Sequence, residues 1–146
     1  MKSKSEAVIY PLFSEHMDRL FKGKDVFCKY VGERLPNITV GAKFMLYLSG
    51  GSKQLIGEAR IDDIKLMTID QILERFADRL FINTEELERY RSNRPKEKKL
   101  LVLLLSNIKK FNTPLTSPKV VTMAGCTLSK GEYKKLIKLM PPSNSS

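Results

Sequence analysis

Two kinds of hydrophobic spacing alternate along this chain, and together they predict short strands with helices between them. Glycine and proline mark residues 32–41 and 109–118 as loops. Alternating or continuous apolar positions, typical of strands, occupy residues 7–11, 25–31, 44–48, 54–61, 100–108 and 119–125. Apolar positions at helical spacing occupy residues 14–23, 68–81, 83–90 and 129–140.

Capping residues predict where the helices begin. Thr68 with Gln71, and Ser129 with Glu132, have the spacing of a capping box, in which each side chain bonds a backbone amide of the other residue. Ser14 is the candidate N-cap of the first helix. These helices between strands predict an α+β fold, a small barrel or strongly curved sheet of five or six short strands with flanking helices. We expect a single domain over residues 1–146, with 141–146 as a disordered tail.

The stretch "LYLSGGSKQLIGEARI", Leu46 to Ile61, predicts a hairpin whose turn is formed by Ser49, Gly50, Gly51, Ser52 and Lys53. It does not fit the phosphate-binding GxxxxGK[ST] loop, which also requires a following helix. The exposed amides, the serines and the lysine of this turn could still contact a phosphate. The same residues are also ordinary turn formers, so the sequence leaves both interpretations open.

Charge adds an indication about partners. The chain of 146 residues has 26 Lys and Arg against 16 Asp and Glu, a net charge of +10. This balance favours a polyanionic partner, nucleic acid first, although lysine enrichment for solubility or thermal stability is the alternative. The longest apolar run, residues 100–105, is too short to span a membrane, and the N-terminus lacks the features of a secretory signal. We therefore expect a cytoplasmic protein that does not bind membranes, and the sequence leaves its oligomeric state open.

Metal and cofactor chemistry have little support in the sequence. Cys28 and Cys126 belong to no CxxC pair and are expected to be small buried thiols. His16 is the only histidine, and it is expected on a helix surface. We therefore predict no metal site and no cofactor.

Five short motifs in this order resemble the PUA-like superfamily, in particular its ASCH and EVE branches and an uncharacterised archaeal relative. The resemblance covers most of the chain and implies a pseudobarrel with a cleft for RNA, modified bases or nucleotides. The motifs are "FKGKDVFCK", "VGAKFMLYLSGG", "LIGEARI", "LSNIKKFNTP" and "MAGCTLSKGEYKKL".

The resemblance also implies site residues. The ASCH signature, roughly GxKxxxxR, places its lysine on Lys24 and its arginine on Lys29, with Gly23 directly before the lysine and Lys in place of Arg. Some ASCH relatives hydrolyse acylated cytidines with a lysine, a threonine and a glutamate. Lys24 and Glu58 would serve here, but Phe27 occupies the threonine position.

The EVE branch recognises modified bases in an aromatic pocket. This chain has no Trp, so such a pocket would use Tyr30, Tyr47 or Phe44.

Three groups of residues are therefore candidate sites. Lys24, Lys29 and Glu58 converge if their strands are neighbours in the barrel; otherwise they form ordinary ion pairs. The turn at residues 49–53 is the second group. The third is a basic surface interspersed with Tyr90 and Phe111 for base stacking. That surface comprises Arg89, Arg91, Arg94, Lys96, Lys98, Lys99, Lys109, Lys110, Lys134, Lys135 and Lys138.

The sequence thus predicts a module that binds RNA or a nucleotide, with recognition of a modified base as one form of this function. Lys24, Lys29 and Lys53 would contact phosphate, and Glu58 would bond a base edge or hold a lysine in place. The alternative is a small metal-independent hydrolase of modified nucleosides or RNA, an amidohydrolase or ribonuclease, with Lys24 as base and Glu58 as acid. A third alternative is a basic module that binds an acidic protein.

Overall fold

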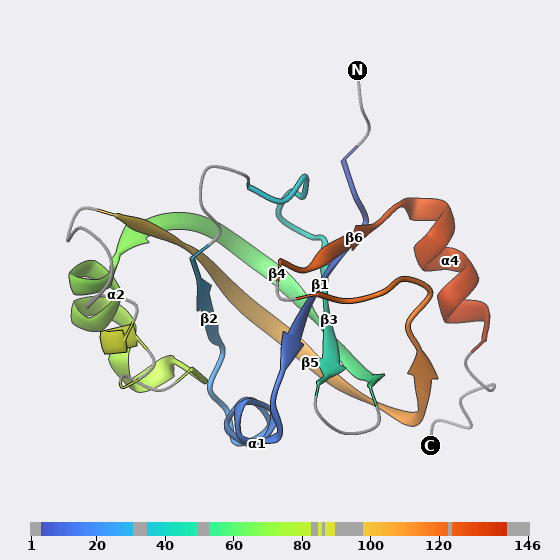
Figure 1. Cartoon of the computed structure of the whole chain (residues 1–146), viewed down its shortest axis with the longest axis horizontal. Helices are drawn as coiled ribbons and strands as arrows, with labels where there is room; N and C mark the ends of the chain where they lie inside the picture. Colours follow the sequence, from blue (N-terminus) through green and yellow to red (C-terminus); the bar gives the residue numbers. More distant parts are fainter. Residues whose placement is uncertain are drawn as a thin grey trace.

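The computed structural model describes residues 4–30, 35–49, 53–82, 85, 87–89, 98–122 and 124–139. The predicted tail, 141–146, lies outside these residues. Helices and strands follow one another along the chain as labelled in Figure 1. They are β1 (Ala7–Leu12), α1 (Ser14–Phe21), β2 (Val26–Lys29), β3 (Lys43–Leu48), β4 (Gln54–Thr68), α2 (Ile69–Phe76), the 3-10 turn η1 (Ala77–Arg79), β5 (Lys99–Thr116), β6 (Cys126–Leu128) and α4 (Lys130–Lys138).

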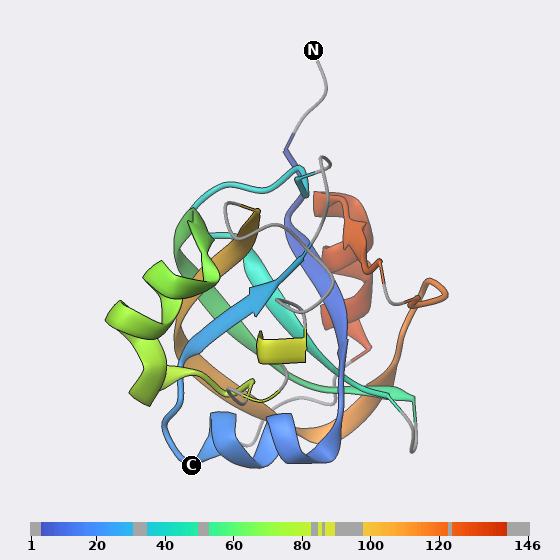
Figure 2. The same ribbon diagram turned by 60° about the vertical axis from the view of Figure 1, so that its left-hand side comes forward.

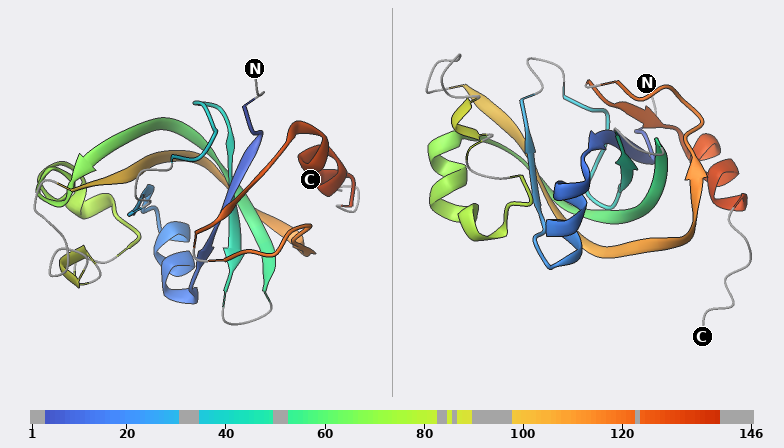
Figure 3. Two further views of the ribbon diagram at one scale, coloured as in Figure 1. Left: turned by 45° about the horizontal axis from the view of Figure 1, so that its top comes forward. Right: turned by 60° about the horizontal axis from the view of Figure 1, so that its bottom comes forward.

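All strands belong to one six-stranded mixed sheet in the order β2-β5-β4-β3-β1-β6. β1 and β3 are parallel, and the other neighbours are antiparallel. Figures 2 and 3 show that β4 and β5 curve strongly, with α2 at one end and α4 at the other. Within the described residues no ladder joins β2 to β1 or β6, so the sheet curls into an open barrel. The predicted α+β architecture with flanking helices is confirmed.

Two hydrophobic clusters cover the two faces of the sheet. Side chains alternate along β1, so Val8 and Tyr10 belong to the larger cluster inside the curl, while Ile9 belongs to the smaller one. The smaller cluster includes Leu136 of α4, so this helix covers the outer face of the sheet. The face of the sheet to which a side chain points therefore determines which of the two clusters, and which surface of the molecule, it can contribute to.

Several strand boundaries differ from the prediction. β5 runs to Thr116, through most of the predicted loop at 109–118, and residues 111–114 bulge out of its ladder between Lys110 and Leu115. Pro114 therefore loses no ladder hydrogen bond. The strand expected at 119–125 is not formed at 119–122 or 124–125, and β6 begins only at Cys126. Val120 is 87% exposed and has no core to pack against.

β1 also continues past the proline that was expected to end it. It runs to Leu12, and Pro11 lies beyond the residues that pair with β6. The missing amide hydrogen of Pro11 therefore leaves no gap in the described ladder between β1 and β6.

The capping predictions are confirmed for two helices and wrong for the first. Both capping boxes, Thr68 with Gln71 and Ser129 with Glu132, are formed. α1 is instead capped at Phe13, whose amide donates to Nδ1 of His16 over 3.1 Å. His16 is buried, so the prediction of a surface histidine is wrong. The hydrogen bond from the Phe13 amide satisfies Nδ1 of His16, and the His16 ring packs against the ring of Phe13. Both contacts favour a buried position for this histidine.

Candidate functional site

The open seam of the barrel lies between β2 and the part of β1 beyond the residues that pair with β6, and aromatic packing spans it. The rings of Tyr10 and Phe27 stack with centroids 5.2 Å apart and an interplanar angle of 23°. Phe27 in turn lies 4.9 Å from Phe44 and 5.8 Å from Phe81, measured between ring centroids. The seam is therefore held by ring contacts where no strand ladder is formed.

Lys29 lies at the end of β2, two residues after Phe27 and on the same face of the strand. Its Nζ is 5.8 Å from the centroid of the Tyr10 ring, a cation–π contact. The side chain is half-buried, and this burial lowers the pKa of Lys29. Among the described residues its ammonium group has no hydrogen bond or ion pair. A partly desolvated cation without a counter-charge is suited to an incoming anion.

Tyr10 is the residue of this site that the sequence analysis missed. Its side chain is only 3% exposed, and burial raises its pKa to about 12. The hydroxyl is therefore protonated at neutral pH, and it too has no hydrogen-bond partner in the part of the chain that the structure describes. Its signal in the sequence was a single polar-tipped aromatic within the buried run "AVIYP".

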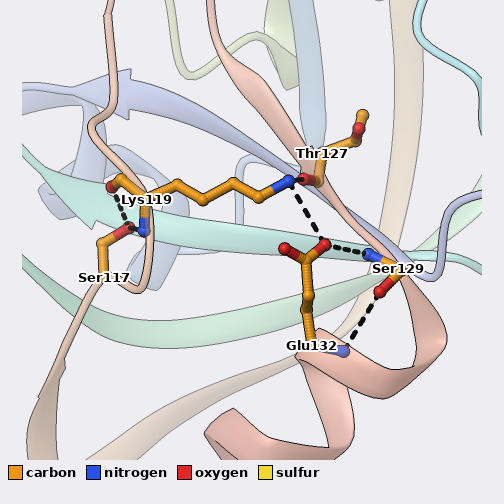
Figure 4. Close-up of polar contacts among 5 residues, drawn as sticks. All are labelled: Ser117, Lys119, Thr127, Ser129 and Glu132. Atoms are coloured by element: carbon orange, nitrogen blue, oxygen red, sulfur yellow. Dashed lines mark hydrogen bonds and ion pairs between the residues drawn. The ribbon is translucent and has the colours of Figure 1, made fainter.

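The loop between β5 and β6 packs against the Tyr10 ring. Gly125 has φ +76°, and a Cβ there would lie 2.5 Å from Cδ1 of Tyr10. Lys119 fastens this loop, because its Nζ donates to the carbonyl of Thr127 over 2.7 Å and pairs with Glu132 at 3.2 Å (Figure 4). Glu132 also caps α4 through Ser129, so loop, strand and helix are held together beside Tyr10.

A second lysine–aromatic pair lies on the same edge of the sheet. Tyr30 directly follows β2, and Nζ of Lys98 is 5.6 Å from the centroid of its ring. Lys98 directly precedes β5, the strand that pairs with β2. The predicted residues Lys29, Tyr30 and Lys98 are therefore brought to one edge, next to Tyr10.

The other proposed partners of Lys29 lie elsewhere. Nζ of Lys24 donates to the carbonyl of Asp78, at the opposite end of β2 from Lys29. Glu58 lies on β4 and accepts a 2.8 Å hydrogen bond from the hydroxyl of Tyr133 in α4. Because β5 separates β2 from β4, the structure does not bring Lys24, Lys29 and Glu58 together.

Two of the three aromatic candidates are also displaced from the seam edge. Phe44 is fully buried in the larger cluster, where its ring packs against the ring of Phe27. Tyr47 is buried in the smaller cluster, on the other face of the sheet. Only Tyr30 among them lies beside the seam.

The glycine-rich turn is a hairpin, as predicted, because β3 and β4 are antiparallel neighbours. The amide of Ser49 donates to the carbonyl of Leu12 over 2.8 Å, and Lys53 is exposed with φ +56°. Gly50, Gly51 and Ser52 lie outside the described residues. Phosphate contact by this turn stays a prediction.

The predicted basic surface is divided among several faces. Lys109 and Lys110 are adjacent on β5 and therefore point to opposite sides of the sheet, and Nζ of Lys110 lies 5.6 Å from the Phe21 ring centroid. Phe111 is only 6% exposed, so the prediction that it stacks on bases is wrong. Arg91, Arg94, Lys96 and Tyr90 lie outside the described residues. The exposed members are Arg89, Lys98, Lys99, Lys109, Lys110, Lys134, Lys135 and Lys138.

Neither a metal cluster nor a membrane span is found in the described part of the chain. No group of three or more His, Cys, Asp or Glu side chains there could hold a metal ion. Likewise, none of the helices described is both long and apolar enough to cross a bilayer.

Comparison with known proteins places this geometry in a family context. A family model described as "Domain of unknown function (DUF365)" matches residues 5–130. An uncharacterized protein, MJECS03, from the archaeon Methanocaldococcus jannaschii is 25% identical over 105 residues, which cover 66% of this chain and 97% of that protein.

Solved structures share the fold. The crystal structure of ASCH from Zymomonas mobilis has a TM-score of 0.77 and 19% identity, with 93% of this chain and 96% of that chain covered. The N-terminal domain of McrB from Staphylothermus marinus has a TM-score of 0.60 and 11% identity, with 94% and 96% covered. The predicted fold, a pseudobarrel like that of ASCH, is therefore confirmed, as is the predicted similarity to an uncharacterised archaeal protein.

Proposed function

We propose that this chain, which belongs to the DUF365 family, binds RNA or a nucleotide at the seam between β1 and β2. The observation on which this proposal rests is the half-buried Lys29 ammonium over the Tyr10 ring, without an anionic partner among the described residues. A phosphate beside Lys29 would restore the electrostatic stabilisation that the lysine loses on burial.

The groups around Lys29 suit the other parts of a nucleotide. The protonated hydroxyl of Tyr10 can donate to a phosphate or accept from a sugar or base. The ring of Tyr30, with Lys98 beside it, offers a surface on which a base can stack. Proteins that bind single-stranded nucleic acid combine cationic contacts to the backbone with stacking of bases on aromatic rings.

Two further observations support this proposal. The net charge of +10 would attract a polyanion at long range. Domains of the same fold include ASCH and the McrB N-terminal domain, although the low identity extends the comparison to the fold alone. The hydrolase with Lys24 and Glu58 has no such support, because each of these side chains bonds a different part of the fold.

Fluorescence anisotropy with short labelled single-stranded RNA tests the proposal. We expect binding that weakens steeply between about 50 and 200 mM salt, because bound phosphates release counterions. Lys29→Met keeps the buried stem but removes the charge, and should weaken binding about tenfold and reduce the salt slope by about 0.7.

Lys22→Met is the matched control. It removes one positive charge from an exposed lysine directly after α1. Lys22 lies before the start of β2, whereas Lys29 lies at the end of that strand. We expect it to change affinity less than twofold. Equal effects of the two substitutions, or absence of RNA binding in the unchanged chain, would refute a site at the seam.

A further inference from the structure

A hollow lies on the outer face of the sheet, away from the seam. It has a volume of about 490 Å³ and is lined by residues of β3, β4 and β5. Ligand pockets commonly enclose about 300–1,000 Å³, so this hollow has room for a small molecule. Lys43 lies two residues before Met45, a member of the cluster under α4, so the hollow and the Tyr10 seam are on different faces.

Like charges face each other across the strands at this hollow. Lys43 on β3 is the direct cross-strand partner of Arg60 on β4. Directly opposed cations destabilise an antiparallel pair, and Arg60 is compensated by an ion pair with Asp62 at 2.6 Å. The ammonium of Lys43 has no ion pair or hydrogen bond within the described residues.

A break in the ladder forms the far wall of the hollow. Glu58 pairs with Lys109 and Arg60 with Ser106, so the single residue between them on β4 faces both Asn107 and Ile108 on β5. Asn107 has φ +48°, which is uncommon for a residue other than glycine. Bulges of this kind re-aim side chains and are frequent beside binding sites.

The charges that remain after internal pairing define the ligand. Arg60 forms an ion pair with Asp62, whereas the ammonium groups of Lys43 and Lys109 have no ion pair in the described part of the chain. One oxygen of Glu58 accepts from Tyr133, and the carboxylate has further acceptor sites. The hollow therefore offers two cations and one acceptor.

From these groups we propose that the hollow is a second site, for a phosphate monoester that also has hydrogen-bond donors, such as a nucleoside monophosphate. The phosphate binds between Lys43 and Lys109, and a hydroxyl or amino group of the ligand donates to Glu58. This site does not depend on the proposed function at the seam, because no residue is shared between them.

NMR titration of the full chain with adenosine monophosphate, adenosine and inorganic phosphate tests the proposal. We expect the monophosphate to shift the amides of Ala59 and Ile108, and adenosine to bind at least tenfold more weakly. Saturable binding of inorganic phosphate at the same amides would support recognition of the phosphate itself.

Substitutions then separate the two sites. The double variant Lys43→Ala, Lys109→Ala should weaken binding of the monophosphate at least tenfold. The double variant Lys22→Ala, Lys130→Ala removes the same charge from two exposed lysines elsewhere and should change it less than twofold. Binding is followed at the amides of Ala59 and Ile108, so a nucleotide bound at the seam does not contribute to this measurement.

Two results would overturn the second site: no shift at Ala59 or Ile108, or equal losses in the two double variants. The melting temperature of each variant verifies that it is folded.

Discussion

Replacement of Gly125 by alanine tests the packing beside Tyr10 most directly. Two separate effects oppose this substitution. With φ +76°, Gly125 has a backbone conformation that costs other residues about 1–2 kcal/mol. The new methyl group would also lie 2.5 and 2.6 Å from two carbons of the Tyr10 ring and 2.8 Å from the carbonyl oxygen of Ile9.

The collision adds to the backbone strain. Tyr10 is packed between Phe27 and the loop, so its ring has little room to move, and overpacking of a core costs about 1–3 kcal/mol. The two effects together predict a loss of about 2–5 kcal/mol in the free energy of unfolding. At about 3 °C per kcal/mol for a chain of this size, the melting temperature should fall by about 6–15 °C.

Urea denaturation followed by circular dichroism measures this loss, and two other glycines serve as controls. Gly23 has φ +109° with open space around it, so Gly23→Ala measures strain alone, about 1–2 kcal/mol. Gly131 lies in α4 with no close neighbour, so Gly131→Ala should stabilise the chain by about 0.5–1 kcal/mol. A loss for Gly125→Ala no larger than that for Gly23→Ala would refute the contact with Tyr10.

Two further predictions concern charge. Burial lowers the pKa of Lys29 below its ordinary value of 10.5. Between these two pKa values the unfolded chain binds more protons than the folded chain. Lys29 therefore makes the free energy of unfolding rise with pH in that window. Urea denaturation should therefore show Lys29→Met gaining stability relative to the unchanged chain at neutral pH and losing this gain near pH 10.5; a constant difference would contradict it. At the start of α4, Ser129→Ala should cost about 1 kcal/mol through loss of the cap, and Lys119→Ala less, because its ion pair is exposed. Thermal melts at low and high salt should show that only the Lys119 effect is reduced by salt, and a larger effect for Lys119 would refute this ranking.

Local patterns predicted the architecture well. Alternation of apolar residues identified the hairpin of β3 and β4, and the capping boxes identified the starts of α2 and α4. These features depend on contacts within a few residues, which the sequence displays directly. The length of β5 was missed because its bulge removes residues 111–114 from the ladder, and prolines in such a segment usually indicate a loop.

The candidate site was predicted only in part, because it depends on strand order. Lys29 was predicted from the ASCH signature and Tyr30 from the resemblance to the EVE branch. Their separation from Glu58 follows from β5 lying between β2 and β4. Tyr10 was missed because a buried tyrosine in a short strand looks like any core aromatic. Its position in the candidate site follows from β1 and β2 meeting across an open seam, which no local pattern encodes.

The length of β4 and β5 has a consequence for how this protein unfolds. Each strand contributes side chains to both hydrophobic clusters: Ile61 and Leu55 on β4, Leu103 and Leu115 on β5. Neither half of the molecule can detach without fraying a strand that the other half also needs. Amides along both strands should therefore exchange with deuterium at one common rate, through whole-molecule opening, instead of region by region.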